Sequence, residues 1–151
     1  MSKDSSLPNQ NVNTVAHSLL EIATQIVGAD SGSVLLVNRK KKSFLIQSSR
    51  GLDTQILKKK NIPFSNGVAE WVVEHKKPLL ISSQSEEVVP KSILKRPQIK
   101  SSFVVPLEFQ DQIYGVFCLN SKTENDRFNE GNLLFLNQLG QIASAALSRT
   151  R

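Results

Sequence analysis

Amphipathic helical segments stand at both ends of the sequence, and strand-forming segments lie between them. In residues 12–27 the apolar side chains recur at three- and four-residue steps, which places them on one face of an α-helix. Gly28 follows as a helix stop. Near the other end, Asn129 is suited to cap a final helix with the same apolar spacing. The chain is therefore limited to folds that cover an apolar helix face at each end.

Five strand segments are predicted between these helices. Residues 33–38 form a nearly unbroken apolar run, which is typical of a strand buried on both faces, and a second strand follows over residues 43–49. Residues 78–82 predict a short strand, and residues 101–109 and 113–121 flank a hairpin turn. Pro106 has no N–H for a ladder and predicts a bulge or an unpaired stretch. The order indicates an α+β fold with an antiparallel sheet.

The middle of the chain is less regular. Residues 52–60 are compatible with a short helix, and residues 62–64 should be extended because Pro63 restricts the residue before it. A helix is expected over residues 68–75. Residues 83–100 alternate polar and charged side chains with two prolines and predict an irregular loop, which in a small domain is usually functional or mobile.

The length of 151 residues fits one domain that buries its own core. Residues 1–11 are rich in Ser, Asn and Gln and predict a flexible lead before a single domain over residues 12–151. No apolar run approaches the roughly 18 residues that a membrane span needs. The N-terminus also lacks the apolar stretch of a signal peptide. We therefore expect a soluble, cytoplasmic protein without a membrane span.

Few side chains in this sequence could carry chemistry. Cys118 is the single cysteine, which excludes a disulfide framework and a cysteine-based zinc site. His17 and His75 are the two histidines, too few for a multi-histidine metal site. We find no Ser-His-Asp order, no paired catalytic carboxylates and no glycine-rich phosphate loop. The expectation is a protein without metal, cofactor or enzymatic activity.

Positive charge is concentrated in residues 38–60, which hold eight Lys or Arg against one Asp, a net +7. Clustered cations gain affinity for nucleic acid by releasing phosphate counterions. No aromatic residues interleave with these clusters, as stacking on single strands would require, which argues against nucleic acid as the partner. A solvated hairpin tip is the simpler interpretation, and a surface for an acidic partner is the alternative. The residues concerned are Arg39, Lys40, Lys41, Lys42, Lys58, Lys59 and Lys60.

The ordered set of segments resembles the GAF domain, a bacterial sensory and regulatory module. The resemblance is carried by residues 29–37, 49–52, 62–63, 67–73, 77–81, 99–107, 113–120 and Phe128, and spans about residues 12–147. It implies a sheet of order 2-1-5-4-3 with the N- and C-terminal helices on one face. It also implies a pocket on the other face, covered by the irregular middle segment.

Chemistry known in this family is not matched by the residues here. Cyclic-nucleotide-binding members carry an Asn-Lys, Phe and acidic-pair signature, but Asn132-Leu133 stand where the acidic pair should be. Bilin-binding members attach the chromophore through Cys followed by His, and here Leu119 follows Cys118. Members that reduce free methionine sulfoxide use a set of cysteines, because one thiolate attacks and another resolves the product. The resemblance therefore also favours a protein that is not an enzyme.

Two sets of site residues are predicted. If the pocket is open, it should be lined by Phe44, Phe64, Trp71, Ser101, Phe103 and Phe117, with Ser102 or Tyr114 as polar contacts. GAF domains tend to dimerise through their first and last helices. A homodimer here would use Val12, Val15, Leu19, Ile22, Ile26, Leu136, Leu139, Ile142, Ala143 and Ala146.

The predicted function follows from these two sites. The expected pocket residues include no charged side chain, which favours a protein that acts by association over one that binds a charged ligand. We expect a stand-alone, non-enzymatic GAF regulator in bacterial signal transduction, acting through homodimerisation and contact with another signalling protein. The alternative is a small-molecule sensor, for a metabolite or nucleotide, whose pocket ligand shifts the terminal helices.

Overall fold

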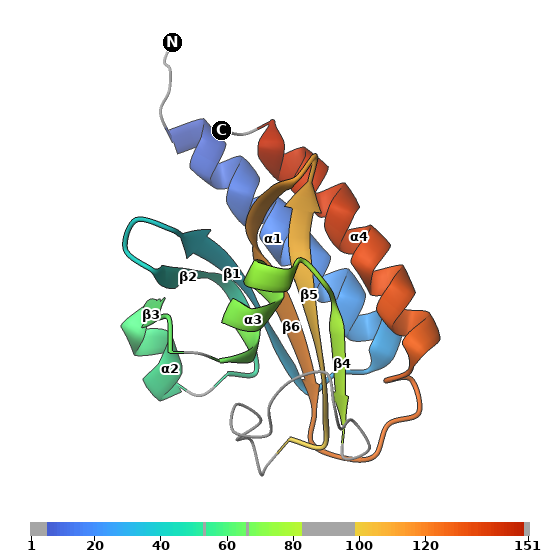
Figure 1. Cartoon of the computed structure of the whole chain (residues 1–151). Coiled ribbons are helices and arrows are strands. Elements are labelled where there is room, and N and C mark those ends of the chain that lie inside the picture. The colour runs from blue at the N-terminus through green and yellow to red at the C-terminus, as the bar shows by residue number, and fades with distance from the viewer. Residues whose placement is uncertain (1–5, 53, 66, 83–98, 150–151) are drawn as a thin grey trace.

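A six-stranded antiparallel sheet organises the chain. The computed structural model describes residues 6–52, 54–65, 67–82 and 99–149 (Figure 1). The strands follow the spatial order β3-β2-β1-β6-β5-β4, and each neighbouring pair is antiparallel. Their bounds are β1 (Ser31–Asn38), β2 (Ser43–Arg50), β3 (Asn61–Pro63), β4 (Leu79–Ser82), β5 (Ser101–Phe109) and β6 (Gln112–Ser121).

Helices cover both faces of the sheet. The long helices α1 (Ser6–Val27) and α4 (Glu130–Ser148) lie side by side in opposite directions on one face (Figure 1). The shorter α3 (Val68–His75) lies on the other face, and α2 (Thr54–Lys59) connects β2 to the edge strand β3. Two apolar cores result. The larger one, between the sheet and α1 and α4, contains Leu20, Phe103, Phe117 and Leu136, and the smaller one packs Val72 of α3 on the sheet.

The α+β class, the antiparallel sheet and the terminal helices on one face are confirmed. The five expected strands take the expected 2-1-5-4-3 order, and the structure adds one strand at the edge. Residues 62–64 are expected only to be extended, and in the structure residues 61–63 pair with residues 43–45 of β2 and form β3. The helix over residues 68–75 and the strand over residues 101–109 have the expected bounds. Of the expected loop over residues 83–100, residues 83–98 lie outside the described part of the chain.

The prediction of a flexible lead over residues 1–11 is wrong for residues 6–11, because α1 begins at Ser6. Pro8 is compatible with this position, since the first N–H groups of a helix have no partner within the helix. Residues 1–5 lie outside the described range. The strand β1 also begins earlier than expected, because Ser31 and Gly32 pair with Asn120 and Leu119 of β6.

Local signals in the sequence position several ends and turns correctly. Gly28 ends α1 with a φ of +65°, a left-handed conformation that glycine adopts without a steric penalty. Asn129 caps α4, and its side chain accepts a hydrogen bond from the Asn132 amide at 2.8 Å. The bulge or unpaired stretch predicted at Pro106 does not occur there, because Pro106 pairs in register with Val116 of β6. The irregularity of this strand pair lies between Leu107 and Glu108 instead.

That irregularity is a bulge at Tyr114. Leu107 pairs with Gly115 and Glu108 pairs with Ile113, so Tyr114 has no opposite residue on β5. The bulge changes the alternation of side chains along β6, because Ile113 and Val116 both face α3 while Tyr114 and Phe117 face α1 and α4. Within the described ranges, no helix has both the length and the apolar character needed to cross a bilayer.

Candidate functional site

The predicted pocket residues do not lie together, because the sheet separates them. Phe44, Phe64 and Trp71 pack on the α3 side of the sheet, whereas Phe103 and Phe117 are completely buried beneath α1 and α4. Successive side chains of a strand point to opposite faces, and the faces are known only once the register is known. The prediction that these five side chains line one pocket is therefore wrong.

The aromatic side chains on the α3 side pack against one another. The ring centroids of Phe44 and Phe64 are 4.8 Å apart. Trp71 stacks on His75 at 4.0 Å, and the His75 Nδ1 lies 2.9 Å from the Trp71 carbonyl oxygen. Phe44 is buried within the α3-side core. This arrangement gives Phe44 and Phe64 packing partners within the chain.

A buried polar network crosses three strands on the α3 side. The Ser102 Oγ donates to the Asn120 Oδ1 at 2.7 Å, and the Asn120 Nδ2 donates to the Ser31 Oγ at 3.1 Å. All three residues are buried. Ser102 was predicted as a polar contact, and Asn120 and Ser31 were not, although a polar residue at the end of the apolar run in β6 was a visible signal. Ser101 alternates with Ser102 and so lies on the α1 and α4 side.

Cys118 lies in the α3-side core, in the same strand as Asn120. It is buried and is not part of a disulfide, and it pairs in register with Ser33 of β1 and Val104 of β5. Within the described ranges, no three His, Cys, Asp or Glu side chains are grouped so that they could hold a metal ion. His17 and His75 are both exposed.

Most of the predicted dimer residues face the sheet. Leu19, Leu136 and Ala143 are buried in the larger core, so the prediction that they form an outward interface is wrong. Val12, Val15, Ile26 and Leu139 are partly buried and pack against that core, and Ala146 is half-buried. The apolar stripe of each helix is the side that the sheet covers. Only Ile22 and Ile142 of the predicted set are exposed.

The exposed apolar side chains of the two helices include two that the sequence reasoning missed. Leu134 is 65% exposed and Phe135 is 48% exposed, while Ile22 is 50% exposed and Ile142 is 68% exposed. We call these four residues the helix face. Ile22 lies near the end of α1, and Asn125, shortly before α4, donates to the Val27 carbonyl oxygen at 2.9 Å. The end of α1 and the start of α4 are therefore adjacent (Figure 1).

The two helices that carry the helix face hold few charged side chains, namely Glu21 in α1 and Glu130 in the first turn of α4. Residues 131–148 of α4 include no charged side chain, in a chain of which 21% of the residues are charged. In α1, Glu21 forms an ion pair with Arg50 of β2. Four large exposed apolar side chains on two helices with so few charges are unusual for a surface that only contacts water.

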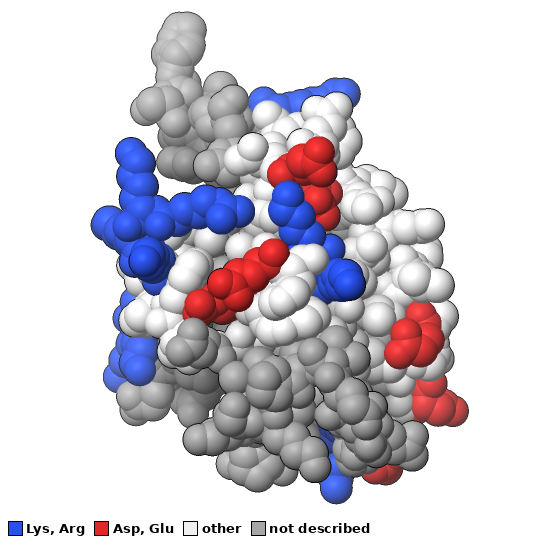
Figure 2. All heavy atoms as spheres, viewed as in Figure 1, with Lys and Arg blue, Asp and Glu red and all other residues white. Residues whose placement is uncertain are grey.

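The two predicted basic clusters lie along one edge of the sheet. Arg39, Lys40, Lys41 and Lys42 are exposed at the turn between β1 and β2, and Lys58, Lys59 and Lys60 are exposed just before β3. Since β3 pairs with β2, both clusters are brought to the same edge. Figure 2 shows Lys and Arg side chains gathered there. We call this surface the basic edge.

Comparisons with known proteins identify the fold. A family model described as the GAF domain matches residues 9–148. A GAF domain/HD domain protein from Geobacter sulfurreducens is 16% identical, with a TM-score of 0.76 and 98% of each chain covered. The GAF-B domain of DevS from Mycobacterium smegmatis is 18% identical, with a TM-score of 0.69 and 91% of this chain and 93% of that chain covered.

A third solved structure belongs to an enzyme. The type II free methionine-R-sulfoxide reductase from Thermoplasma acidophilum is 12% identical, with a TM-score of 0.74 and 94% of this chain and 95% of that chain covered. The comparison with curated proteins finds no match. At these identities the solved structures establish a shared fold.

Proposed function

Because the chain belongs to the GAF domain family, a family of signalling and ligand-binding domains, we propose that it is a non-enzymatic regulatory module that self-associates through its helix face. The proposal rests on one observation, the exposure of Ile22, Leu134, Phe135 and Ile142 on two helices that each hold a single acidic side chain and no Lys or Arg. Removing a large apolar side chain from water contributes about 1.5–3 kcal/mol when it is fully buried. In a two-fold symmetric dimer each contribution occurs twice.

The distribution of exposed apolar residues supports this surface over others. Among the described residues, five large apolar side chains are exposed, and four of them form the helix face. The fifth, Leu45, lies on β2. We propose a second copy of the chain as the partner. In a two-fold symmetric dimer both copies contribute the same patch, so each helix face would cover the other.

The thiol chemistry supports a non-enzymatic role. One relative in fold is a methionine sulfoxide reductase, and a thiolate that attacks a sulfoxide needs a second thiol to resolve the product. This chain has Cys118 alone, and its side chain is buried in β6. An intramolecular resolving step is therefore not available to it.

Sedimentation velocity on an Ile142→Asp variant tests the self-association. Ile142 is 68% exposed, so burying it at an interface contributes about 1–2 kcal/mol per copy, or about 2–4 kcal/mol per dimer. At 1.4 kcal/mol per decade, we expect the dimer dissociation constant to rise by about 30-fold or more. The wild-type protein should sediment as a dimer and the variant as a monomer at the same concentration.

Leu45→Asp is the matched control for this variant. Leu45 is also an exposed apolar residue, but it lies on β2, away from the helix face. It should leave the dimer intact. A wild-type protein that is monomeric throughout the accessible concentration range contradicts the proposal, and so does an Ile142→Asp variant that dimerises as strongly as wild type.

The output of the module is proposed to be contact with an acidic signalling protein at the basic edge. The seven cations of this edge are exposed, so binding through them should weaken steeply as ionic strength rises. Affinity that is independent of salt would contradict this part of the proposal. A cytoplasmic location stays a prediction from the sequence.

A second candidate function, small-molecule sensing on the α3 side, is favoured by the network of Ser31, Asn120 and Ser102. These side chains place buried hydrogen-bonding groups on the sheet face that also holds the smaller apolar core, and ligand sites commonly combine the two. Native mass spectrometry of the purified protein tests it. A retained small molecule that an Asn120→Leu variant loses supports sensing, and wild-type protein that retains none contradicts it.

A further inference from the structure

We propose that a groove beside the turn between β1 and β2 binds a small amphipathic anion, with a carboxylate or phosphate group on a short apolar body. The groove has a volume of about 620 Å³ and is formed by side chains of α1, β1, β2, β3, β6 and α4 and of the β1–β2 turn. We call it the hairpin groove. Its lining residues are Val12, Leu36, Val37, Asn38, Arg39, Lys40, Leu45, Gln47, Asn61, Gln112, Ile113, Tyr114 and Leu147.

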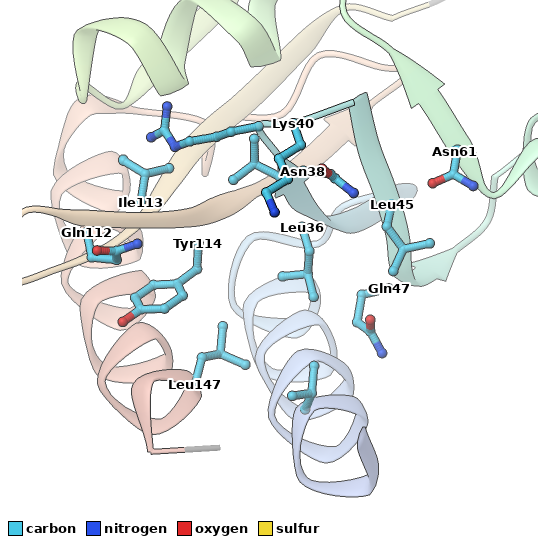
Figure 3. A pocket seen from close by; sticks show the side chains of 13 residues that line it. Leu36, Asn38, Lys40, Leu45, Gln47, Asn61, Gln112, Ile113, Tyr114 and Leu147 are labelled. Atoms are coloured by element: carbon cyan, nitrogen blue, oxygen red, sulfur yellow. The ribbon is translucent and has the colours of Figure 1, made fainter. Parts of the chain in front are cut away.

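The floor of the hairpin groove is apolar. Leu36 lies at its centre, between Tyr114 and Leu147 on one side and Leu45 and Gln47 on the other (Figure 3). Leu45 is 37% exposed and is the one exposed large apolar residue outside the helix face among the described residues. An apolar body seated here would cover Leu45 and gain the free energy of removing both surfaces from water.

The rim of the groove carries positive charge and no negative charge. Arg39 and Lys40 line it, and Lys41 and Lys42 follow in the same turn. None of the lining residues is Asp or Glu. Charge complementarity therefore favours an anion and disfavours a cation. Four amide side chains add hydrogen-bonding groups that can orient a head group, namely Asn38, Gln47, Asn61 and Gln112.

Hydrogen bonds order the turn that carries these cations. The Asn38 Oδ1 accepts from the Lys41 amide at 3.1 Å, and the Lys42 amide donates to the Arg39 carbonyl oxygen at 3.3 Å. Gln47 has no opposite residue on β1, because Val34 pairs with Ser48 and Leu35 with Ile46. Its side chain donates to the Asn13 side chain of α1. These bonds hold the two sides of the groove in place before a ligand arrives, which lowers the ordering cost of binding.

The size of the groove limits the ligand class. A volume of about 620 Å³ lies within the roughly 300–1,000 Å³ range of small-molecule sites. The groove is also separate from the network of Ser31, Asn120 and Ser102. The groove uses the last residues of β1 and the first residues of β6, whereas Ser31 begins β1 and Asn120 lies near the end of β6.

Titration of ¹⁵N-labelled protein with octanoate, octyl phosphate and 1-octanol, followed by NMR, tests the site. We expect saturable shifts of the backbone amides of residues 38–40, 45 and 112 with at least one of the two anions. The anion that binds with the higher affinity identifies the preferred head group. The Arg39→Gln/Lys40→Gln variant should bind that anion with an affinity at least threefold lower than wild type. It should leave 1-octanol, which has no charge, within twofold of its wild-type affinity.

Two matched variants separate the groove from general charge and from the helix face. Lys58→Gln/Lys59→Gln removes the same charge from the basic edge outside the groove and should change anion affinity by less than threefold. Leu45→Asp places a carboxylate in the floor and should abolish binding, whereas Leu134→Asp on α4 should not weaken it. Binding that survives Leu134→Asp is independent of the proposed dimer.

Three results would overturn the proposal. The first is the absence of saturable shifts with either anion. The second is an anion affinity that falls less than threefold in Arg39→Gln/Lys40→Gln, or that falls as much in the Lys58→Gln/Lys59→Gln control. The third is a set of shifts centred away from the hairpin groove. None of these results bears on self-association, which is measured separately by sedimentation.

Discussion

Replacing Asn120 with leucine should leave two hydroxyl groups buried without their partner, because the Asn120 side chain bonds both Ser102 and Ser31. All three residues are buried, so water does not readily replace the lost bonds. A buried polar group left without a partner costs about 1–3 kcal/mol. Two such groups amount to about 2–6 kcal/mol, and the leucine side chain offsets part of this by apolar contact. We expect a net loss of about 2–4 kcal/mol in the free energy of unfolding.

The same reasoning predicts that a triple variant is more stable than Asn120→Leu alone. Adding Ser102→Ala and Ser31→Ala to Asn120→Leu removes the hydroxyl groups that the first substitution left unpaired. Replacing both members of a buried hydrogen bond by apolar groups is often nearly neutral. The triple variant should therefore recover most of the lost stability and lie within about 1 kcal/mol of wild type.

Equilibrium unfolding in urea measures both variants. Trp71 is the single tryptophan and lies on α3, over the face that holds the network, so its fluorescence reports on this region. Far-ultraviolet circular dichroism should give the same transition if unfolding is two-state. A triple variant no more stable than Asn120→Leu would refute the reasoning, because unpaired hydroxyl groups would then not be the source of the loss.

Two further substitutions test the fold. Gly115→Ala should prevent the folding of the sheet, because a Cβ at this position would lie 1.9 Å from the Leu35 carbonyl oxygen of the neighbouring strand; a cooperative thermal transition close to that of wild type, measured by circular dichroism, would contradict this. Asn129→Ala removes the side-chain cap of α4 and should lower the free energy of unfolding, measured in urea, by about 1 kcal/mol. Asn129→Asp keeps an acceptor oxygen and should therefore retain most of the stability that the cap contributes.

The elements that sequence reasoning predicted well are those specified by local signals. The helix over residues 68–75 and the strand over residues 101–109 have their expected bounds, and Gly28 and Asn129 end and cap the long helices as expected. Residue spacing and turn chemistry determine these features over a few neighbouring positions.

The candidate pocket failed because it depends on which face each strand residue occupies. Phe103 and Trp71 lie on opposite sides of the sheet, and the bulge at Tyr114 changes the alternation along β6. Register and bulges are properties of strand pairs, so a single strand sequence does not reveal them. The hairpin groove joins Val12 of α1 to Leu147 of α4, residues that only the folded chain brings together.

Two residues of the helix face, Leu134 and Phe135, were missed for a different reason. Periodicity identifies the stripe that a helix buries, and the predicted interface therefore included Leu19 and Leu136, which the sheet covers. Leu134 and Phe135 lie outside that stripe and are exposed. The visible signal was apolar residues on both sides of the α4 helix, together with the absence of charge along residues 131–148.

Pulsed dipolar spectroscopy on spin-labelled protein tests self-association through the helix face most directly. Gln138 is exposed on α4, between Phe135 and Ile142, and Cys118 is buried, so Gln138→Cys supplies the accessible thiol for a single label. Lys58→Cys on the basic edge is the matched control. We predict a defined intermolecular distance between Gln138 labels that is shorter than that between Lys58 labels. Gln138 labels without intermolecular coupling, or a shorter distance from the Lys58 labels, would contradict the proposed interface.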